Sequence, residues 1–413
     1  MKQETTMTFF STPKTIRLAG LIWLGLSTFG QAHAYDLGPV KLHGFISQGY
    51  ILSSDNNINA SDTADNGSFD FNEMAINATY QLNDSIVLSG QLGSRKLGDE
   101  GNNDLYIDYL QADIELQDWL GTRLGRFKLP LGFYNQTRDI DLARPTVFLP
   151  QSIYPESYRP FVASVTGGLV YGNIHHDAVG DLDYEIYYGR GGEDDDSCLV
   201  QSLEVILKGR DMDMTSKDVY GGAVQYSPNI DGLRFNLSVT LGEATFDYIE
   251  QSSGYSLDAS LDGSMEPISV LSAEYTINDF TFVSEYMTAR QYSTLRIGPT
   301  TYFQDKLTKS EGFYISGAYH VTEKLETAVY WESFYPDKND KDGKKQVARG
   351  GEDHSGWHRA WTLAIRYDIT DWWLVKAEGR LINGTALTSP HYNPPGTLEE
   401  NWESLTLKTT LYF

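Results

Sequence analysis

The feature that most constrains the fold is a series of segments of about ten residues in which apolar and polar side chains alternate. In residues 233–241, Leu, Phe, Leu, Val and Leu occupy every second position, and Arg, Asn, Ser and Thr occupy the positions between them. A period of two residues is that of a β-strand, whose successive side chains point to opposite faces. After residue 34 no apolar run is long enough for a transmembrane helix, which needs about 20 residues. The sequence therefore predicts an all-β protein.

The alternating segments are connected in turn by short turns and by longer polar loops. A short turn such as Asn278-Asp279 joins the two segments of a pair, and a longer loop leads to the next pair. Long loops are expected over 191–217, where acidic residues gather, around 248–263 and over the charged stretch 337–355. Sixteen strands are expected, near residues 41–52, 69–82, 86–92, 105–116, 120–129, 161–174, 181–190, 219–226, 233–241, 268–277, 280–289, 313–321, 325–331, 357–369, 373–381 and 402–413.

This layout matches a sixteen-stranded antiparallel transmembrane β-barrel, which has an even strand number, short turns at one end and long loops at the other. Alternation alone does not separate a barrel from a soluble sandwich, because a sandwich turns its polar face outward and a barrel turns it inward. Aromatic residues such as Trp119, Trp331 and Trp357 lie at strand ends, where an interfacial girdle would lie. The last strand alternates up to Phe413, and its ending LTLKTTLYF resembles the C-terminal assembly signal of outer-membrane proteins, with Leu411 and Phe413 as its closing residues.

The first 34 residues have the pattern of a secretory signal peptide. Lys14 and Arg17 precede the apolar run LAGLIWLGL, and Ala32-His33-Ala34 supplies a small-x-small cleavage motif. Cleavage is expected between Ala34 and Tyr35, which leaves residues 35–413 as one barrel domain. The single cysteine, Cys198, cannot form an intramolecular disulfide, so this exported chain depends on hydrogen bonding and packing.

The chain is strongly acidic, with a formal net charge of −24. Such a charge argues against nucleic acid as a partner. It suits a solvated surface or an outer surface that binds divalent cations. No cofactor is expected.

Residues 121–160 break the alternating pattern. Pro130 and Gly132 end the strand that starts at Leu120, and about thirty residues follow with no helical or strand period. Loops of this length are uncommon in compact domains and are usually functional or disordered. The stretch is too aromatic and too apolar for disorder. We therefore expect it to pack inside the surrounding structure and to line a passage of mixed charge.

Two segments resemble porins of the phosphate-selective O/P type and their dicarboxylate-porin-like relatives. They are GRFKLPLGFYNQTRDIDLARP, residues 125–145, and LHGFISQGY, residues 42–50. The resemblance implies a homotrimeric sixteen-stranded barrel in the outer membrane of a Gram-negative bacterium, inserted by the barrel-assembly machinery and surrounded by outer-membrane lipid. It also implies an inward-folded third long loop and passive diffusion of small hydrophilic solutes or ions. Phosphate specificity does not transfer, because no ladder of Lys and Arg is visible.

The same resemblance makes residues 130–160 the loop that narrows the pore. It implies that Phe127 and Leu129 face lipid, so that Arg126 and Lys128 face the lumen. The candidates to line the constriction are Arg126, Lys128, Arg138, Asp139, Asp141, Arg144, Glu156 and Arg159. For each charge of the loop, a structural ion pair within the loop is the alternative.

Two other classes of protein remain open, an outer-membrane barrel enzyme and a secreted, soluble carbohydrate-binding β protein. His175-His176-Asp177 lies on an expected short turn, which favours a solvated turn over a metal or acid–base site. No Gly-x-Ser-x-Gly motif occurs. The loops at 55–59 and 338–343 do not complete a calcium-binding pattern. The sequence therefore favours a channel over an enzyme.

Overall fold

The structure, a computed structural model, describes residues 35–36, 39–251, 256–394 and 396–413. The expected signal peptide, residues 1–34, lies outside these residues, as does Ala34 of the expected cleavage site. Within the part of the chain that the structure describes, no helix is both long enough and apolar enough to cross a bilayer.

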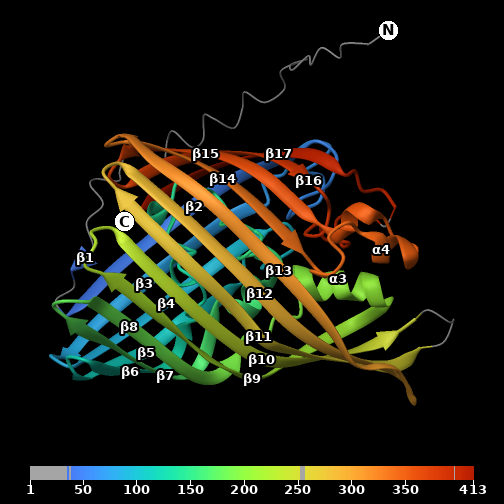
Figure 1. Cartoon of the computed structure of the whole chain (residues 1–413), viewed down its shortest axis with the longest axis horizontal. Coiled ribbons are helices and arrows are strands. Elements are labelled where there is room, and N and C mark those ends of the chain that lie inside the picture. The colour runs from blue at the N-terminus through green and yellow to red at the C-terminus, as the bar shows by residue number, and fades with distance from the viewer. Residues whose placement is uncertain (1–34, 37–38, 252–255, 395) are drawn as a thin grey trace, which may run out of the picture.

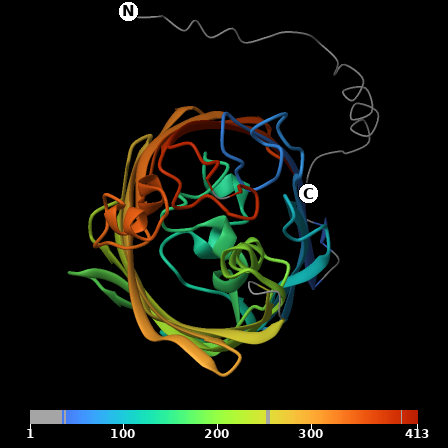
Figure 2. The same cartoon turned by 90° about the vertical axis from the view of Figure 1, so that its right-hand side faces the viewer.

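Seventeen strands are described, and all but the two-residue β1 (Tyr35–Asp36) form one closed antiparallel ring. β1 pairs with β2, and the ring closes where β17 pairs with β2, with Leu411 opposite Ile46. Figures 1 and 2 show this ring from the side and along its axis. The sixteen strands of the wall are β2 (Val40–Ser53), β3 (Phe71–Asn83), β4 (Ile86–Leu97), β5 (Leu105–Gln117), β6 (Leu120–Lys128), β7 (Ser164–His176), β8 (Gly180–Gly191), β9 (Gly209–Pro228), β10 (Leu233–Glu250), β11 (Leu257–Ile277), β12 (Phe280–Ile297), β13 (Thr300–Thr322), β14 (Leu325–Tyr335), β15 (His358–Thr370), β16 (Trp373–Asn383) and β17 (Asn401–Tyr412). The predicted sixteen-stranded barrel is therefore confirmed.

The two faces of the wall differ in polarity in the sense expected for a barrel in lipid. On β17, Leu405 and Leu407 are exposed on the outside, whereas Thr406, Lys408 and Thr410 are buried on the inside. A soluble sandwich would place the apolar face in its core. Apolar side chains outside and polar side chains inside are the arrangement of a membrane barrel.

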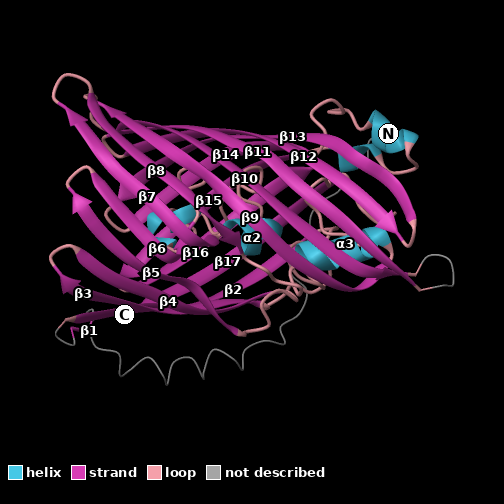
Figure 3. Ribbon diagram, turned by 90° about the horizontal axis from the view of Figure 1, so that it is seen from below, coloured by secondary structure: helices cyan, strands magenta, loops and turns pink. Residues whose placement is uncertain are grey.

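Connections at one end of the ring are short turns, and most of those at the other end are long. Residues 278–279 join β11 to β12 and residues 371–372 join β15 to β16, whereas residues 129–163 join β6 to β7 and residues 384–400 join β16 to β17. Figure 3 shows the tilted strands, with α3 near the loop end. The short helices of the connections are η2 (Asn135–Thr137), η3 (Asp141–Ala143), η4 (Glu156–Tyr158), α2 (Arg159–Val162), α3 (Cys198–Leu207), α4 (Lys344–Ala348) and η5 (Asp353–Gly356).

Strands β9 to β13 are longer than expected and run past the rest of the wall at the loop end, as Figure 1 shows at its right side. The loop expected around 248–263 is wrong, because β10 continues to Glu250 and β11 begins at Leu257. The loop expected over 191–217 is also wrong in part, because it contains α3 and the first nine residues of β9. Similarly, the start of the strand expected at residue 161 belongs to α2.

The polarity of the wall reverses along these long strands. In the part of β10 nearer the turn end, Leu237 is exposed on the outer face and Ser238 is buried on the inner face. The pairing shifts register around Gly242. On the loop-end side of Gly242, Phe246 and Tyr248 are buried on the inner face and Asp247 is exposed on the outer face. The extension therefore has the polarity of a soluble sheet, with its apolar face turned inward.

Helix α3 covers the apolar face of this extension. Ser197 caps its first turn, since its hydroxyl accepts a hydrogen bond from the N–H of Val200. Val200 packs in one cluster with inward residues of β9, β10, β11 and β12: Met212, Met214, Phe246, Tyr248, Ala259 and Leu295. The helix and the extended strands thus form a small second core at the loop end of the barrel.

Candidate functional site

The candidate site is built around residues 129–163, the segment between β6 and β7. Figure 2 shows this teal and green part of the chain inside the ring of strands. Its two ends are tied by Asn135, whose side-chain amide donates to the carbonyl oxygens of Leu129 at 2.9 Å and Val162 at 2.6 Å. Asn135 therefore holds the two ends of the segment together where they join the wall.

Carboxylates from the strands hold the backbone of this segment. Glu285 on β12 accepts the N–H of Phe133 at 2.9 Å, and Glu332 on β14 accepts the N–H of Ser152 at 2.8 Å. Glu378 on β16 accepts the N–H of Val147 at 2.8 Å. A charged acceptor forms a stronger hydrogen bond than a neutral one. These contacts come from widely spaced strands, so they fix the segment across the barrel.

A glycine is needed where the segment first meets the opposite wall. Gly132 has φ of +58° and its N–H donates to the Ser238 hydroxyl at 2.8 Å. A Cβ at this position would lie 2.2 Å from the Tyr154 hydroxyl and 2.7 Å from a carboxylate oxygen of Glu285. Both the left-handed backbone and the close packing therefore require glycine here.

Phe127 and Leu129 do not face lipid, and that prediction is wrong. Each is 1% exposed and lies in the largest apolar cluster, with Tyr154 of the segment and Val165 and Tyr187 of the wall. Their neighbour Leu124 is the half-exposed residue that faces outward. The rule that apolar strand residues face lipid fails here because the segment brings its own apolar surface into the barrel.

The two basic residues next to Phe127 nevertheless contact the interior. Lys128 forms ion pairs with Asp108 of β5 and with Asp139 of the segment. Arg126 donates from Nε to the carbonyl oxygen of Asp108 at 3.2 Å. Pairing of β5 with β6 ends at the Leu110–Arg126 pair, so Lys128 lies beyond the last paired residues of these two strands.

The other charges predicted in the segment are held in ion pairs. Glu156 contacts Arg95 of β4 at 2.6 Å, Arg138 at 3.0 Å and Arg159 at 3.5 Å. Arg159 also pairs with Asp139 and with Glu73 of β3. The alternative of structural ion pairs therefore describes these residues, although Arg95 and Glu73 belong to the wall rather than to the segment.

Asp141 is the anchor on the far side of the barrel. It accepts from Lys408 at 2.9 Å, from Lys376 at 3.3 Å and from the Thr410 hydroxyl at 2.7 Å. Arg144 lies at 3.9 Å from the same carboxylate and also donates to the carbonyl oxygen of Val147 at 3.3 Å. These contacts tie the middle of the segment to β16 and β17.

The surrounding cations keep the carboxylates of the segment ionised. Burial alone would raise the pKa of Glu156, but Arg138, Arg95 and Arg159 outweigh it and lower the pKa to about 2. Burial likewise opposes ionisation of Asp139, and Arg159 and Lys128 lower its pKa below the usual value. Both carboxylates are therefore ionised at neutral pH.

The wall supplies partners to this network that the sequence did not single out. The main ones are Glu73, Arg95, Asp108, Glu285, Glu332, Lys376, Glu378, Arg380 and Lys408, all on strands. Most occupy the polar positions of alternating segments, which was a signal that they face the interior. Nothing in a period of two residues indicates which of these positions meet the 129–163 segment.

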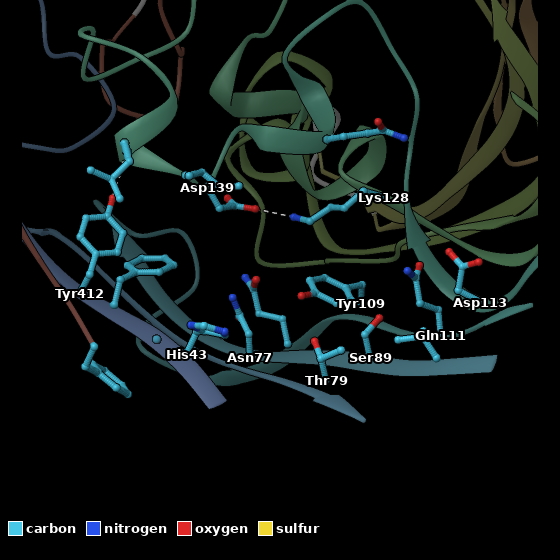
Figure 4. Close-up of a pocket in the computed structure, with 18 of the residues that line it drawn as sticks. His43, Asn77, Thr79, Ser89, Tyr109, Gln111, Asp113, Lys128, Asp139 and Tyr412 are labelled. Carbon is cyan, nitrogen blue, oxygen red and sulfur yellow. Dashed lines mark hydrogen bonds and ion pairs between the residues drawn. The ribbon is translucent and has the colours of Figure 1, made fainter. Parts of the chain in front are cut away.

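Two cavities lie on either side of the Lys128–Asp139 ion pair. The larger, of about 790 Å³, extends from the turn end near Asp371 to Lys128 and Asp139. We call it the turn-end cavity; Figure 4 shows its lining and the Lys128–Asp139 contact. The smaller, of about 270 Å³, is lined by Arg126, Arg159, Asp108 and the acidic stretch that includes Asp194. We call it the loop-end cavity. The ion pairs of Lys128, Asp139 and Arg159 thus lie between the two cavities.

His175 and His176, at the end of β7, lie away from the 129–163 segment. His175 is exposed and contacts Asp181 at 2.8 Å and Asp177 at 3.1 Å beside a short turn. In the described part of the chain, no group of three or more His, Cys, Asp and Glu side chains is arranged to hold a metal ion.

Comparisons with known proteins find relatives in structure alone. No protein-family model matches the sequence, and no curated protein matches it. The fold is similar to OmpT, an outer membrane protein of Vibrio cholerae, with a TM-score of 0.53 and 12% identity over 92% of this chain and 100% of that one.

Two further solved structures show the same fold. The outer membrane channel DcaP of Acinetobacter baumannii has a TM-score of 0.53 and 9% identity over 91% of this chain and 97% of that one. Salmonella typhi OmpF, solved in complex with daunomycin, has a TM-score of 0.53 and 13% identity over 92% and 99% of the two chains. At these identities the likeness concerns the barrel fold.

Proposed function

We propose that this protein is an outer-membrane porin, a water-filled channel through which small hydrophilic solutes or ions diffuse passively. The observation that carries the proposal is a closed ring with an apolar outer wall and a charged interior that contains cavities on both sides of an ion-pair cluster. A closed barrel leaves no unpaired strand edge in lipid. Charged side chains on the inner wall and on a segment inside it filter solutes by charge and width.

The constriction of this channel is the 129–163 segment. Lys128, Asp139, Arg159 and Arg126 line the cavities and meet the passing solute. A second group of charges, Arg138, Asp141, Arg144 and Glu156, holds the segment in place through ion pairs. The eight constriction candidates thus divide into four residues that line the passage and four that hold the segment in place.

The proposed cellular context follows from the same fold. The chain carries a signal peptide over residues 1–34, cleaved before Tyr35, and resides in the outer membrane of a Gram-negative bacterium. The barrel-assembly machinery recognises Leu411 and Phe413 at the end of β17. The protein is a homotrimer of the phosphate-selective O/P-like group and has no enzymatic activity. The fold shared with an outer membrane channel supports the membrane location, and the resemblance of residues 42–50 and 125–145 supports the group and the trimer.

The test is reconstitution of the purified full-length protein in a planar lipid bilayer. Stepwise ion conductance is expected, and the protein is expected to remain in the outer membrane after a carbonate wash. A folded protein that gives no conductance steps would contradict the channel, and lipase and protease assays would then test the enzyme alternative.

A further inference from the structure

The wall of the turn-end cavity carries two parallel rows of hydrogen-bonding side chains. In the first row, His43 lies opposite Asn77, Asn77 opposite Gln91, and Gln91 opposite Tyr109. Neighbouring strands are about 4.8 Å apart, so this row of four side chains spans about 15 Å. Figure 4 shows His43, Asn77 and Tyr109 along the same wall.

The second row runs beside the first, toward the turn end. Thr79 lies opposite Ser89, and Ser89 lies opposite Gln111. All three line the cavity. The residues between the rows, Ala78, Gly90 and Leu110, point the other way, and Leu110 is exposed on the outer face. The cavity therefore has one continuous wall, formed by β2 to β5, of amide, hydroxyl and imidazole groups.

Most of these groups have no partner among the described residues. Gln91 donates to Asp108 at 2.9 Å, whereas the side chains of Asn77, Thr79, Ser89 and Gln111 make no hydrogen bond to another described residue. The amide oxygen of Asn77 is fully buried and unpartnered. Amides and hydroxyls both donate and accept, so they match a solute that carries many hydroxyl groups.

Apart from Asp371 at the turn end, the charged side chains that border this wall are held in ion pairs. Arg123 pairs with Asp113 at 2.8 Å and with Glu185 at 3.0 Å, and Lys128 pairs with Asp108 and Asp139. An anionic solute would have to displace a carboxylate from one of these pairs, and a cationic solute would have to displace a basic group. An uncharged solute meets the neutral rows without breaking any ion pair.

We infer that the β2–β5 wall of the turn-end cavity binds uncharged polyhydroxylated solutes of the size of mono- and disaccharides during their passage. This inference rests on the proposed channel function. The cavity volume of about 790 Å³ lies in the range of about 300–1,000 Å³ that is usual for small-molecule sites. The aromatic rings of Phe45, Tyr109 and Tyr412 in the same lining supply faces against which the C–H groups of a sugar ring pack.

The test uses maltose as the neutral probe and succinate as the charged probe, with the full-length protein in a planar bilayer. Maltose is expected to reduce the ion current in a saturable manner, at lower concentrations than succinate does. Asn77→Ala combined with Gln111→Ala removes one hydrogen-bonding group from each row. Loss of two hydrogen bonds, each of about 0.5–1.5 kcal/mol, corresponds to a rise of about tenfold in the half-saturating maltose concentration.

The matched control is Gln225→Ala. Gln225 on β9 lines a different cavity, of about 530 Å³, on the far side of Arg123, so its removal is expected to leave the half-saturating concentration unchanged. Folding of each variant is checked by its shift in gel migration on heating. Asn77→Ser, which keeps a hydroxyl at this position, is expected to show a smaller effect and serves if the double variant does not fold.

The possible results separate the inference from the proposed function. Ion steps with a saturable maltose effect that weakens in the double variant but not in Gln225→Ala support the inference. Ion steps without a saturable maltose effect, or with a stronger effect of succinate, overturn the inference and leave the channel intact. An equal change in the double variant and the control also overturns it. Absence of ion steps overturns the channel and the inference together.

Discussion

The carboxylate of Glu378, on β16, accepts the backbone N–H of Val147 at 2.8 Å, although the two residues are 231 positions apart in the chain. The same oxygen accepts the N–H of Phe148 at 3.3 Å. Irregular backbone inside a protein needs partners for its N–H groups. The wall of the barrel thus supplies, through the Glu378 carboxylate, the hydrogen-bond acceptor that a helix or a strand would otherwise provide for these N–H groups.

Glu378→Ala is expected to loosen the 129–163 segment. The N–H groups of Val147 and Phe148 would each lose their acceptor, at a cost of about 1–3 kcal/mol per buried group. Cleavage of the folded barrel by thermolysin within this segment should become faster, and single-channel current noise should increase. The exposed Glu403 on β17 offers a control, since Glu403→Ala removes a carboxylate that faces away from the segment. Equal cleavage rates in the two variants would contradict the anchoring role.

Lys128→Gln and Asp139→Asn are expected to shift ion selectivity in opposite directions. Without Lys128, the carboxylates of Asp108 and Asp139 lose a cation, so the passage between the cavities becomes more negative and favours cations. Without the negative charge of Asp139, Lys128 and Arg159 each lose an anionic partner. The passage then becomes more positive and favours anions. The zero-current potential in a KCl gradient measures both shifts. Lys344→Gln, at an exposed position of α4, should change nothing, and shifts of the same sign for the first two variants would show that this ion pair lies off the solute path.

Asp194 is expected to make selectivity depend on pH. Burial and the nearby Glu100, with smaller contributions from the adjacent carboxylates, raise the pKa of Asp194 to about 6. Because the folded protein holds this proton more tightly than the unfolded chain does, Asp194 is neutral below about pH 6 and adds a negative charge to the loop-end cavity above it. Arg126 and Arg159 in the same cavity remain charged throughout.

Cation preference should therefore rise as the pH increases from about 5 to about 7, measured by the zero-current potential. Asp194→Asn should flatten this dependence, while Asp211→Asn, at an exposed position of β9, should retain it. A pH profile that is the same in Asp194→Asn and in the unchanged protein would assign the titration to another group.

The reversal of polarity along β10 predicts where the bilayer ends. Nitroxide labels on Leu237→Cys and Asp247→Cys, each in a Cys198→Ser background, should report different surroundings although both side chains point outward. The label at 237 should be accessible to oxygen in the hydrocarbon, and the label at 247 to a water-soluble nickel complex. Equal accessibility to oxygen at both sites would place the whole strand in lipid and contradict the boundary at Gly242.

The strand number could be predicted from sequence because it depends on a period of two residues. The inward direction of the polar face was indicated by the aromatic residues at strand ends and by the last strand, which alternates up to Phe413. On β16, for example, Lys376, Glu378 and Arg380 occupy alternate positions, and all three are buried on the inner face. The extension of β10 could not be predicted in this way. Phe246 and Tyr248 belong to the same alternation as Asn236 and Ser238, but they are apolar because α3, 40 or more positions earlier in the chain, covers them.

The interior position of the candidate residues was predictable from the sequence, but their contacts were not. All eight residues singled out between Arg126 and Arg159 contact the interior network or its cavities. Their partners were not predictable, because a contact such as that between Asp141 and Lys408 joins positions far apart in the chain. The lipid-facing assignment of Phe127 failed for a related reason, since an apolar residue of the wall can be buried by a segment as readily as by lipid.

Asn135 joins Leu129 to Val162 through two hydrogen bonds. The chain between these two residues can therefore be exchanged for a segment of another length. A shorter or longer insert that keeps this amide and its two carbonyl acceptors would leave β6 and β7 paired as they are. The width of the passage can therefore change while β6 and β7 stay paired, provided that the insert also supplies N–H groups to the buried carboxylates of Glu285, Glu332 and Glu378.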